Sequence, residues 1–319
     1  MKAIVLAGGY ATRMWPITRH RPKMLLPVGE STVIDDIVDD LESDERINEI
    51  FISTNEAFAS EFEEHFAQRG TDKITMSVED TADEDEKFGV VGALAQLVDR
   101  EGLGDEDLLV IAGDNLFGFS ISEFIDQFKE YDDPMLAAYD VGDLEKAKSY
   151  GLIQVEGDEI VDFQEKPDNP KSTLVSIACY AFPADAIRFD EYLSGDNNPD
   201  EPGWFIQWLV DHGSVRPFSF EDIWYDIGTA DSYLEAVEFA LQGENIVADD
   251  ATVESSKLGD NVHVLPGATI RNSSVEDTVV FQDATITDSD VSDSVIDVKA
   301  SVHDKELDNA LLGQHTRVQ

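Results

Sequence analysis

The sequence opens with MKAIVLAGGYATRMWPITRHRPKMLLPVG (residues 1–29), and this segment indicates both a fold class and a kind of ligand. The apolar run Ile4–Ala7 ends in Gly8 and Gly9, which is typical of a buried parallel strand that runs into a tight turn. Four of the 22 lysine and arginine residues then follow closely: Arg13, Arg19, Arg21 and Lys23. Because the chain also holds 68 acidic residues, this concentration of cations predicts a polyanionic ligand.

The composition is that of a folded and strongly acidic protein. Its 319 residues are enough for one large domain and a smaller one, and a hydrophobic fraction of 42% argues against disorder. The formal net charge of −46 would repel nucleic acid and anionic membranes, so neither is expected as a partner. Such lysine-poor surfaces resemble those of proteins from salt-loving archaea, and we expect the fold to loosen at low ionic strength.

Several classes of protein are excluded by simple sequence features. A single cysteine, Cys179, rules out a disulfide within the chain, and its apolar neighbours predict a buried core thiol. Gly8 and Gly9 interrupt an apolar run that is too short for a secretory signal. The sequence contains no run of roughly 18 apolar residues, so no membrane-spanning helix is predicted. The sequence therefore predicts a cytoplasmic protein.

The first third of the chain alternates strand and helix patterns. Strands are expected at residues 2–7, 50–54, 74–78 and 108–112, and helices at 32–41, 57–68 and 90–100. This order predicts right-handed βαβ units and a Rossmann-like α/β fold with a mixed, mainly parallel sheet. Because ligands bind at the carboxyl ends of such strands, Gly8–Gly9 and Gly113–Asp114 are expected at one edge.

The next part of the chain has a mixed pattern. Short strands are expected at residues 135–141, 152–155, 160–164 and 175–182, with a helix at 204–212. We interpret this part as a sugar-sized binding subdomain built on the first sheet. A helix expected at 230–241 follows Trp224–Thr229, and its N-terminus would present free amides to an anion.

After Gly243, apolar residues recur every six positions, as in Leu258, Val264 and Ile270. This period predicts a left-handed parallel β-helix over residues 244–319, with a first domain over residues 1–243. An irregular strand-rich tail is the alternative, because the period is imperfect around Ser273–Thr278 and Asp288–Ser294.

The glycine pair and the cations fit a phosphate site. A strand that ends in Gly8–Gly9 lets backbone amides cradle phosphates, yet the spacing matches neither a Walker loop nor a dinucleotide fingerprint. Arg13 could grip two phosphate oxygens and Lys23 could add a mobile charge, so both would contact a triphosphate. Arg19, His20 and Arg21 are expected to shape the loop. The alternative is a solvated basic turn.

Residues 6–18 (LAGGYATRMWPIT) and 21–28 (RPKMLLPV) resemble the sugar-1-phosphate nucleotidylyltransferases, which include thymidylyl-, uridylyl- and guanylyltransferases. The resemblance continues in family order through Gly113-Asp114-Asn115, Tyr150-Gly151, Glu165-Lys166-Pro167 and Trp224-x-Asp226-x-Gly228-Thr229. It implies that a sugar 1-phosphate attacks the α-phosphate of a nucleoside triphosphate, giving a nucleoside-diphosphate sugar and pyrophosphate.

The resemblance also implies roles for single residues. Arg13 would steady the leaving pyrophosphate and Lys23 would bridge the reacting phosphates. The expected nucleotide-binding residues are Leu6, Gly8, Gly9, Gly89 and Asp114. Mg²⁺ would be held by Asp114 and Asp226, because it prefers hard oxygen ligands. The sugar phosphate would be bound by Gly151, Glu165, Lys166 and Trp224, although Glu165-Lys166 could also be a surface ion pair.

The loop expected to read the base departs from the family pattern. Relatives often carry Gln or Glu followed by Pro, whereas residues 84–88 here are EDEKF, before Gly89. The reader of the base is therefore not identified. We favour glucose 1-phosphate with dTTP or UTP. Mannose 1-phosphate with GTP is the enzymatic alternative, and a non-catalytic sugar-nucleotide-sensing homologue is the alternative of another class.

The C-terminal tail raises one more possibility, an acyltransferase of the hexapeptide-repeat class. Such enzymes need a catalytic histidine, and we expect His263, His303 and His315 to be structural or exposed to solvent. An oligomer interface or an allosteric lid is the expected role of the tail. The chain is accordingly expected to form a homo-oligomer.

Overall fold

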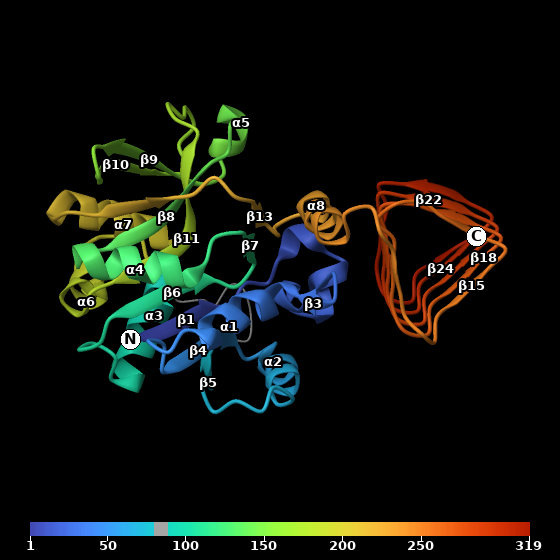
Figure 1. Ribbon diagram of the computed structural model, residues 1–319, viewed down its shortest axis with the longest axis horizontal. Coiled ribbons are helices and arrows are strands. Elements are labelled where there is room, and N and C mark those ends of the chain that lie inside the picture. Colours follow the sequence, from blue (N-terminus) through green and yellow to red (C-terminus); the bar gives the residue numbers. More distant parts are fainter. Residues whose placement is uncertain (80–88) are drawn as a thin grey trace. The chain divides into compact units, whose positions relative to one another are not determined.

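The computed structural model describes residues 1–79 and 89–319, which fall into two compact units. The first unit comprises residues 1–9 and 37–224, and the second comprises residues 10–36 and 225–319. We call Tyr10–Asp36 the basic segment. It belongs with the C-terminal part of the chain, although it follows the first strand directly in sequence (Figure 1).

A nine-stranded mixed sheet forms the centre of the first unit. Its main path is β10-β9-β11-β6-β1-β4-β5, while β8 pairs with β11 and β12 pairs with β8. The strands are β1 (Lys2–Leu6), β4 (Glu49–Asn55), β5 (Ile74–Glu79), β6 (Leu108–Ala112), β8 (Met135–Asp140), β9 (Gly151–Glu156), β10 (Glu159–Glu165), β11 (Leu174–Phe182) and β12 (Arg216–Ser219). Strands β1, β4, β5 and β6 run parallel, and β11 is antiparallel to its neighbours, so the predicted mixed sheet is confirmed.

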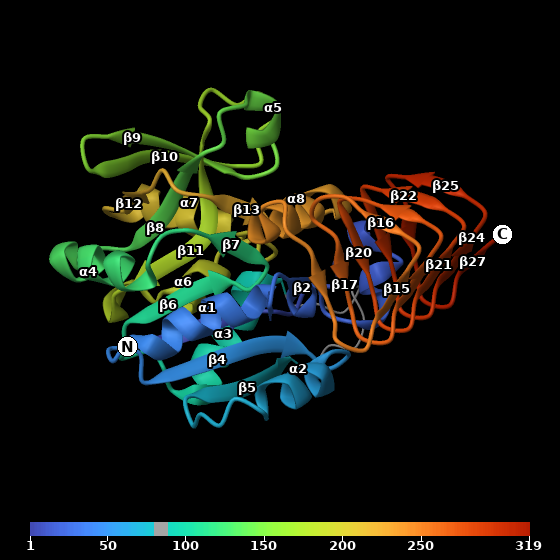
Figure 2. The ribbon, with the colours of Figure 1, turned by 45° about the vertical axis from the view of Figure 1, so that its right-hand side comes forward.

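Helices of the first unit connect and cover these strands (Figure 2). They are α2 (Ala59–Phe66), α3 (Val90–Glu101), α4 (Ile121–Tyr131), α5 (Leu144–Ala147), α6 (Phe189–Leu193) and α7 (Pro202–His212), while α1 (Val33–Ser43) spans the point where the chain passes between units. The sequence analysis overlooked α4. Its signal is a Ser120 N-cap followed by buried Ile121, Phe124, Ile125 and Phe128 at helical spacing.

The core of the first unit joins strands β1, β6, β8 and β11 to helices α3, α6 and α7. Val110, Phe182 and Phe205 are almost completely buried there, and each such side chain contributes about 1.5–3 kcal/mol of transfer free energy. Cys179 is fully buried as predicted, and burial raises the pKa of its thiol well above its ordinary value. In the described part of the chain, no helix combines the length and apolar character needed to cross a membrane.

The second unit contains the predicted left-handed parallel β-helix. Three parallel sheets stack its coils: β14-β17-β20-β23-β26, β15-β18-β21-β24-β27 and β16-β19-β22-β25. The strands are β14 (Ile246–Val247), β15 (Thr252–Glu254), β16 (Lys257–Leu258), β17 (His263–Val264), β18 (Thr269–Arg271), β19 (Ser274–Val275), β20 (Thr278–Val280), β21 (Thr285–Thr287), β22 (Asp290–Ser292), β23 (Ser294–Ile296), β24 (Ser301–His303), β25 (Glu306–Asp308), β26 (Leu311–Leu312) and β27 (Arg317–Val318). Val264 pairs with Val280, and Val280 with Ile296, so equivalent positions recur every 16 residues, after a first coil of 17 residues in which Val247 pairs with Val264.

The coil of 16 residues explains the imperfect period in the sequence. Consecutive inward residues are Val264, Ile270, Val275, Val280, Ile286, Val291 and Ile296, all of them buried. Their spacing is therefore six, five and five residues rather than a constant six. The shorter faces fall at 273–278 and 288–294, where the six-residue pattern fails.

The corners of the β-helix account for part of its acidity. Asn261, Asp277, Asp293 and Asn309 occupy one corner in successive coils, and each has a positive φ, between 42° and 53°. Asn and Asp tolerate this left-handed conformation better than other residues with side chains. The Nδ2 of Asn261 also donates a hydrogen bond to Oδ1 of Asp277, at 2.8 Å.

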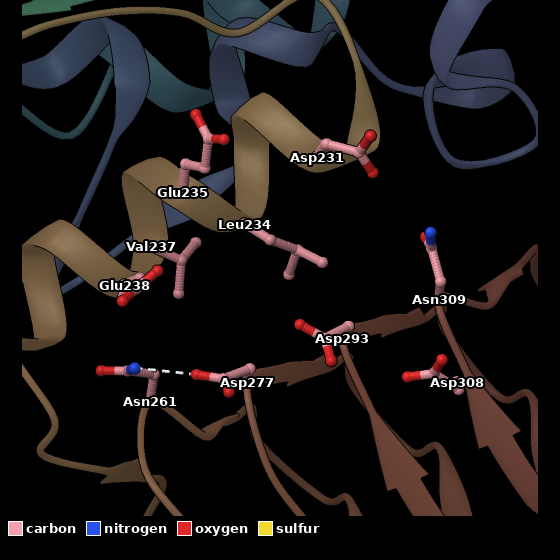
Figure 3. A pocket seen from close by; sticks show the side chains of 10 residues that line it. All are labelled: Asp231, Leu234, Glu235, Val237, Glu238, Asn261, Asp277, Asp293, Asp308 and Asn309. Carbon is pink, nitrogen blue, oxygen red and sulfur yellow. Dashed lines mark hydrogen bonds between the residues drawn. The ribbon is translucent and has the colours of Figure 1, made fainter.

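Helix α8 (Ala230–Leu241) faces this corner within the second unit. It begins at a capping box in which Thr229 and Ser232 bond to each other's backbone amides. Residues of α8 and of the corner line a cavity of about 360 Å³ (Figure 3). Six of the lining side chains are acidic: Asp231, Glu235, Glu238, Asp277, Asp293 and Asp308.

Candidate active site

In the first unit, the carboxyl ends of β1, β4 and β6 lie in register at one edge of the sheet. Leu6 pairs with Ser53 on one side and Ala112 on the other, and the amide of Gly113 donates to the carbonyl of Leu6 at 2.9 Å. The turn that carries Asp114 therefore starts beside Leu6, two residues before Gly8. The carbonyl of Gly8 accepts a hydrogen bond from Asn55 Nδ2, at 2.7 Å.

Backbone at this edge is accessible to a ligand. Among the described residues, a Cβ placed on Gly9 would meet no atom within 4 Å, whereas one on Gly8 would lie 3.2 Å from Oε1 of Glu79. Glu79 was overlooked in the sequence, although it ends strand β5. Burial raises the pKa of the Glu79 carboxyl, and a hydrogen bond from Ser53 Oγ (3.3 Å) partly opposes this shift.

Asn115 links two of the predicted site residues. Its Nδ2 donates to Oδ1 of Asp114 at 3.2 Å, and its Oδ1 accepts a hydrogen bond from Nε1 of Trp224 at 2.6 Å. Asn115 is buried. The indole of Trp224 packs edge-on against Tyr150, with ring centroids 4.9 Å apart. The side-chain amide of Asn115 therefore holds both Asp114, a predicted metal ligand, and Trp224, a predicted wall of the sugar site.

Gly151 and Glu165 are register partners in the β9–β10 hairpin. A Cβ on Gly151 would clash with Cζ of Phe163 and would also lie 3.1 Å from Oε2 of Glu165, so a glycine is needed between this ring and this carboxylate. Gly203 at the start of α7 is a second such position, because a Cβ there would lie 1.6 Å from the same oxygen. No sequence motif singled out Gly203.

The charges around Glu165 are closely coupled. Burial and the neighbouring Glu201 raise the pKa of the Glu165 carboxyl to about 7, while Lys166 lowers it. Lys166 Nζ lies 3.9 Å from Glu165 and donates to Oε2 of Glu201 at 2.5 Å. The side chain of Glu165 is only 7% exposed, so Glu165-Lys166 is a half-buried network and not an exposed surface pair.

Gly89 begins α3 with a φ of 77°. A Cβ there would lie 2.4 Å from the carbonyl oxygen of Pro199, and the amide of Val91 donates to that oxygen at 3.0 Å. The close approach of the Pro199 carbonyl explains why residue 89 is a glycine. Residues 84–88, where a reader of the base was sought, lie outside the described residues.

In the second unit, the basic segment carries three short 3₁₀ turns: η1 (Thr12–Met14), η2 (Ile17–His20) and η3 (Lys23–Leu25). Arg13 lies in the first, and a Cβ on Gly228 would lie 2.6 Å from its Nη2. The same Cβ would lie 3.5 Å from Oδ1 of Asp226. Arg13 and Asp226 therefore converge on one glycine. Lys23 lies in the third turn and is 8% exposed.

The predicted metal ligands are divided between the units, with Asp114 in the first and Asp226 in the second. Within residues 1–79 and 89–319, no three His, Cys, Asp or Glu side chains gather in the manner of a metal site. Each aspartate offers hard oxygen atoms of the kind that Mg²⁺ prefers.

Known proteins resemble this chain in sequence and in fold. The sequence profile described as nucleotidyl transferase matches residues 2–243. A provisionally named mannose-1-phosphate guanyltransferase of Sulfolobus acidocaldarius is 28% identical over 287 residues, 86% of this chain and 76% of its own length. A glucose-1-phosphate thymidylyltransferase of Streptomyces griseus is 28% identical over 304 residues, again 86% and 76%. The fold matches a UDP-glucose pyrophosphorylase structure with a TM-score of 0.65 at 23% identity, over 76% of this chain and 98% of that one.

Proposed function

Because the chain belongs to the nucleotidyl transferase family, we propose that it transfers a nucleotidyl group from a nucleoside triphosphate to a sugar 1-phosphate. The attacking phosphate oxygen is already ionised, so no strong general base is needed. Pyrophosphate leaves as the new phosphoanhydride bond forms. Catalysis then consists mainly of positioning and of neutralising phosphate charge.

The convergence of Arg13 and Asp226 on Gly228 carries this proposal. Because Gly228 lacks a Cβ, the guanidinium of Arg13 and the carboxylate of Asp226 can both lie close to it, which places a cation suited to phosphate beside an anion suited to a counter-ion. We assign Arg13 to the leaving pyrophosphate and Lys23 to the reacting phosphates. The backbone of Leu6, Gly8 and Gly9 would hold the nucleotide, in a catalytic domain that we propose spans residues 1–243.

Enzymes of this family generally use a divalent metal. We propose Mg²⁺, held by Asp114 and Asp226, whose carboxylates fit a hard cation that keeps several water ligands. When bound, Mg²⁺ would offset negative charge on the phosphates. Asn115 would orient Asp114 for this role, through its 3.2 Å hydrogen bond.

We infer that the sugar phosphate binds beside Gly151, Glu165, Lys166 and Trp224. Glu165 in its ionised form would accept hydrogen bonds from sugar hydroxyls, and Lys166 would bind the phosphate in place of its partner Glu201. Glucose 1-phosphate with dTTP or UTP is our preferred pair. From the sequence alone we also propose a cytoplasmic location, adaptation to high salt and a homo-oligomeric assembly.

Mannose 1-phosphate with GTP is a second candidate, which requires Glu79 in its ionised form, whereas the burial that raises the pKa of this carboxyl favours its protonated form. An ionised carboxylate only accepts hydrogen bonds, and guanine offers two adjacent donors, N1–H and N2–H. Uracil and thymine offer one donor between two carbonyl oxygens, which suits an amide or a protonated carboxyl. The variant Glu79→Gln therefore discriminates between them: turnover of dTTP or UTP would persist, and turnover of GTP would fall.

The test supplies each nucleoside triphosphate with several sugar 1-phosphates and Mg²⁺ in high salt, and measures the release of pyrophosphate. We expect one base and one sugar to be clearly preferred. Absence of turnover with every pair would favour the non-catalytic sensing homologue and would remove the proposed activity.

A further inference from the structure

Before β2 (Pro27–Val28), β3 (Ser31–Thr32) and the start of α1, residues 10–26 of the basic segment form only short 3₁₀ turns. These turns are closed by backbone hydrogen bonds such as Met14 N to Ala11 O at 3.0 Å and Leu26 N to Lys23 O at 3.0 Å. The hydroxyl of Thr18 adds a bond to the carbonyl of Ala11, at 2.8 Å. Isolated 3₁₀ turns of three or four residues are weak elements, so this segment needs support from other parts of the unit.

The β-helix provides such support through a buried ion pair. Nη2 of Arg21 lies 2.6 Å from Oδ1 of Asp297, and the two side chains are 15% and 0% exposed. Asp297 Oδ1 also accepts a hydrogen bond from the backbone amide of Val298, at 2.7 Å. The guanidinium carbon of Arg21 stands 4.5 Å from the ring centroid of Phe281, a buried residue one coil earlier.

A second contact involves the following coil. A Cβ on Gly313 would lie 2.7 Å from Cβ and Cγ of Pro16, so this glycine lets the coil approach the basic segment closely. Pro16 and Arg21 lie in the sequence between Arg13 and Lys23. Helix α8 contributes a third contact, because the hydroxyl of buried Tyr233 donates to the carbonyl of Pro27 at 2.8 Å.

We propose that Asp297 of the β-helix is a positioning residue for nucleotidyl transfer, acting through Arg21 on the turns that carry Arg13 and Lys23. This inference rests on the proposed function of those two cations. The β-helix would thereby take part in binding the nucleoside triphosphate without touching it. This role differs from the oligomer interface or lid expected from the sequence.

The nature of the contact favours positioning over simple stabilisation. Burying two charges costs solvation energy that their attraction only partly offsets, so apolar residues could often serve stability as well. A buried ion pair does fix geometry, because each charge has one low-energy partner. Small misplacements of catalytic groups are expensive, on the order of 100-fold in rate for 1 Å.

The experiment compares the variants Asp297→Asn, Arg21→Gln and their double variant with wild-type chain in high salt. For Asp297→Asn we expect the KM of the preferred nucleoside triphosphate to rise on the order of tenfold. The KM of the sugar 1-phosphate should stay unchanged. The double variant should have a nucleotide KM no higher than that of either single variant, because both substitutions remove the same Arg21–Asp297 contact.

Hydrogen exchange gives a readout that does not depend on activity. We expect amides of residues 10–28 to exchange faster in Asp297→Asn than in wild type, with the sheet of the first unit unaffected. The matched control is Glu254→Gln, which breaks the exposed Glu254–Arg271 pair of the β-helix (2.9 Å) and should change neither readout. If the wild-type chain turns over no substrate pair, the proposed function is wrong. Hydrogen exchange of residues 10–28 would then still show whether Asp297 positions the basic segment.

A folded Asp297→Asn variant with wild-type exchange and wild-type KM for the nucleotide would overturn the proposal. Should that variant fail to fold, Gly313→Ala decides instead. It pushes against Pro16 without leaving a charge unpaired, and it should give the same selective rise in the KM of the nucleotide. Wild-type values for Gly313→Ala would then overturn the proposal.

Discussion

The sheet edge and the basic segment hold their proposed site residues in different ways. At the sheet edge, Leu6 and Gly113 are fixed by strand register, so neighbouring strands define the backbone that precedes Asp114. In the basic segment, Arg21 depends on Asp297, which is 276 residues away in sequence. Regular strand pairing therefore sets the backbone of the first unit's sheet edge, whereas contacts distant in sequence set that of the basic segment in the second unit.

The largest effect should come from the proposed metal ligands, one in each unit. Asp114→Ala and Asp226→Ala would each remove several kcal/mol of charge stabilisation and lower kcat/KM by about three orders of magnitude. Release of pyrophosphate at saturating Mg²⁺ measures this loss. Asp105→Ala, at an exposed loop position, is the control and should keep wild-type turnover. Wild-type rates in either ligand variant would remove that residue from the metal site.

Close packing in the first unit can be tested at Gly203. Gly203→Ala would place a methyl group on Oε2 of Glu165 and force this carboxylate aside, at a cost of about 1–3 kcal/mol in stability. We expect a lower melting temperature and a higher KM for the sugar 1-phosphate. Gly104→Ala is the matched control, because a Cβ there meets nothing within 4 Å. Equal behaviour of both variants would contradict the packing argument.

The raised pKa of Glu165, about 7, predicts a pH dependence with a definite sign. The folded chain binds this proton more tightly than the unfolded chain, whose carboxyl titrates near 4.5. Ionised Glu165 therefore lowers stability above pH 7, and stability is gained as the pH falls from about 7 towards 4.5. The affinity for the sugar should instead fall as the pH falls, because protonation of Glu165 removes a hydrogen-bond acceptor for sugar hydroxyls.

The measurement is the KM of the sugar 1-phosphate between pH 5.5 and 8.5. We expect it to rise several-fold below pH 7 in wild type, as hydrogen bonds to a charged group are lost. Glu165→Gln should show a high KM that no longer follows pH. A wild-type profile that is retained by Glu165→Gln would assign the titration to another group.

The smallest effect concerns salt and the acidic cavity between α8 and the β-helix corner. Partial burial raises the pKa of Asp293, and the neighbouring Asp277 and Asp308 raise it further, so ionised Asp293 is unfavourable in the folded chain. Screening reaches about 3 Å in 1 M salt and about 30 Å in 0.01 M salt. The second unit should therefore weaken when salt is removed.

Asp293→Asn should reduce the salt dependence of the melting temperature. Circular dichroism measures this temperature at salt concentrations from molar KCl to dilute buffer. Asn keeps the left-handed corner conformation, so the comparison isolates charge. Asp283→Asn changes a corner residue that does not line the cavity, and it should behave like wild type. Identical salt curves for all three chains would show that the cavity does not set the response.

Periodicity made most of the fold predictable. Strands β1, β4, β5 and β6 and the inward residues of the β-helix, such as Val264 and Ile270, repeat at spacings that buried faces impose. Features that depend on distant contacts were not predictable. Asn115, Gly203 and Glu79 gain their roles from neighbours that only the folded chain supplies, and no local pattern marks Asp297 among 68 acidic residues.

The contacts of Pro16 with Gly313 and of Arg21 with Asp297 also bear on the order in which the chain becomes active during synthesis. Asp297 is translated 276 residues after Arg21. At ordinary elongation rates the basic segment would wait on the order of tens of seconds for this partner. We expect nascent chains to acquire the sheet first and nucleotide affinity only after the β-helix has been made, so chains that lack the β-helix would not compete for substrate.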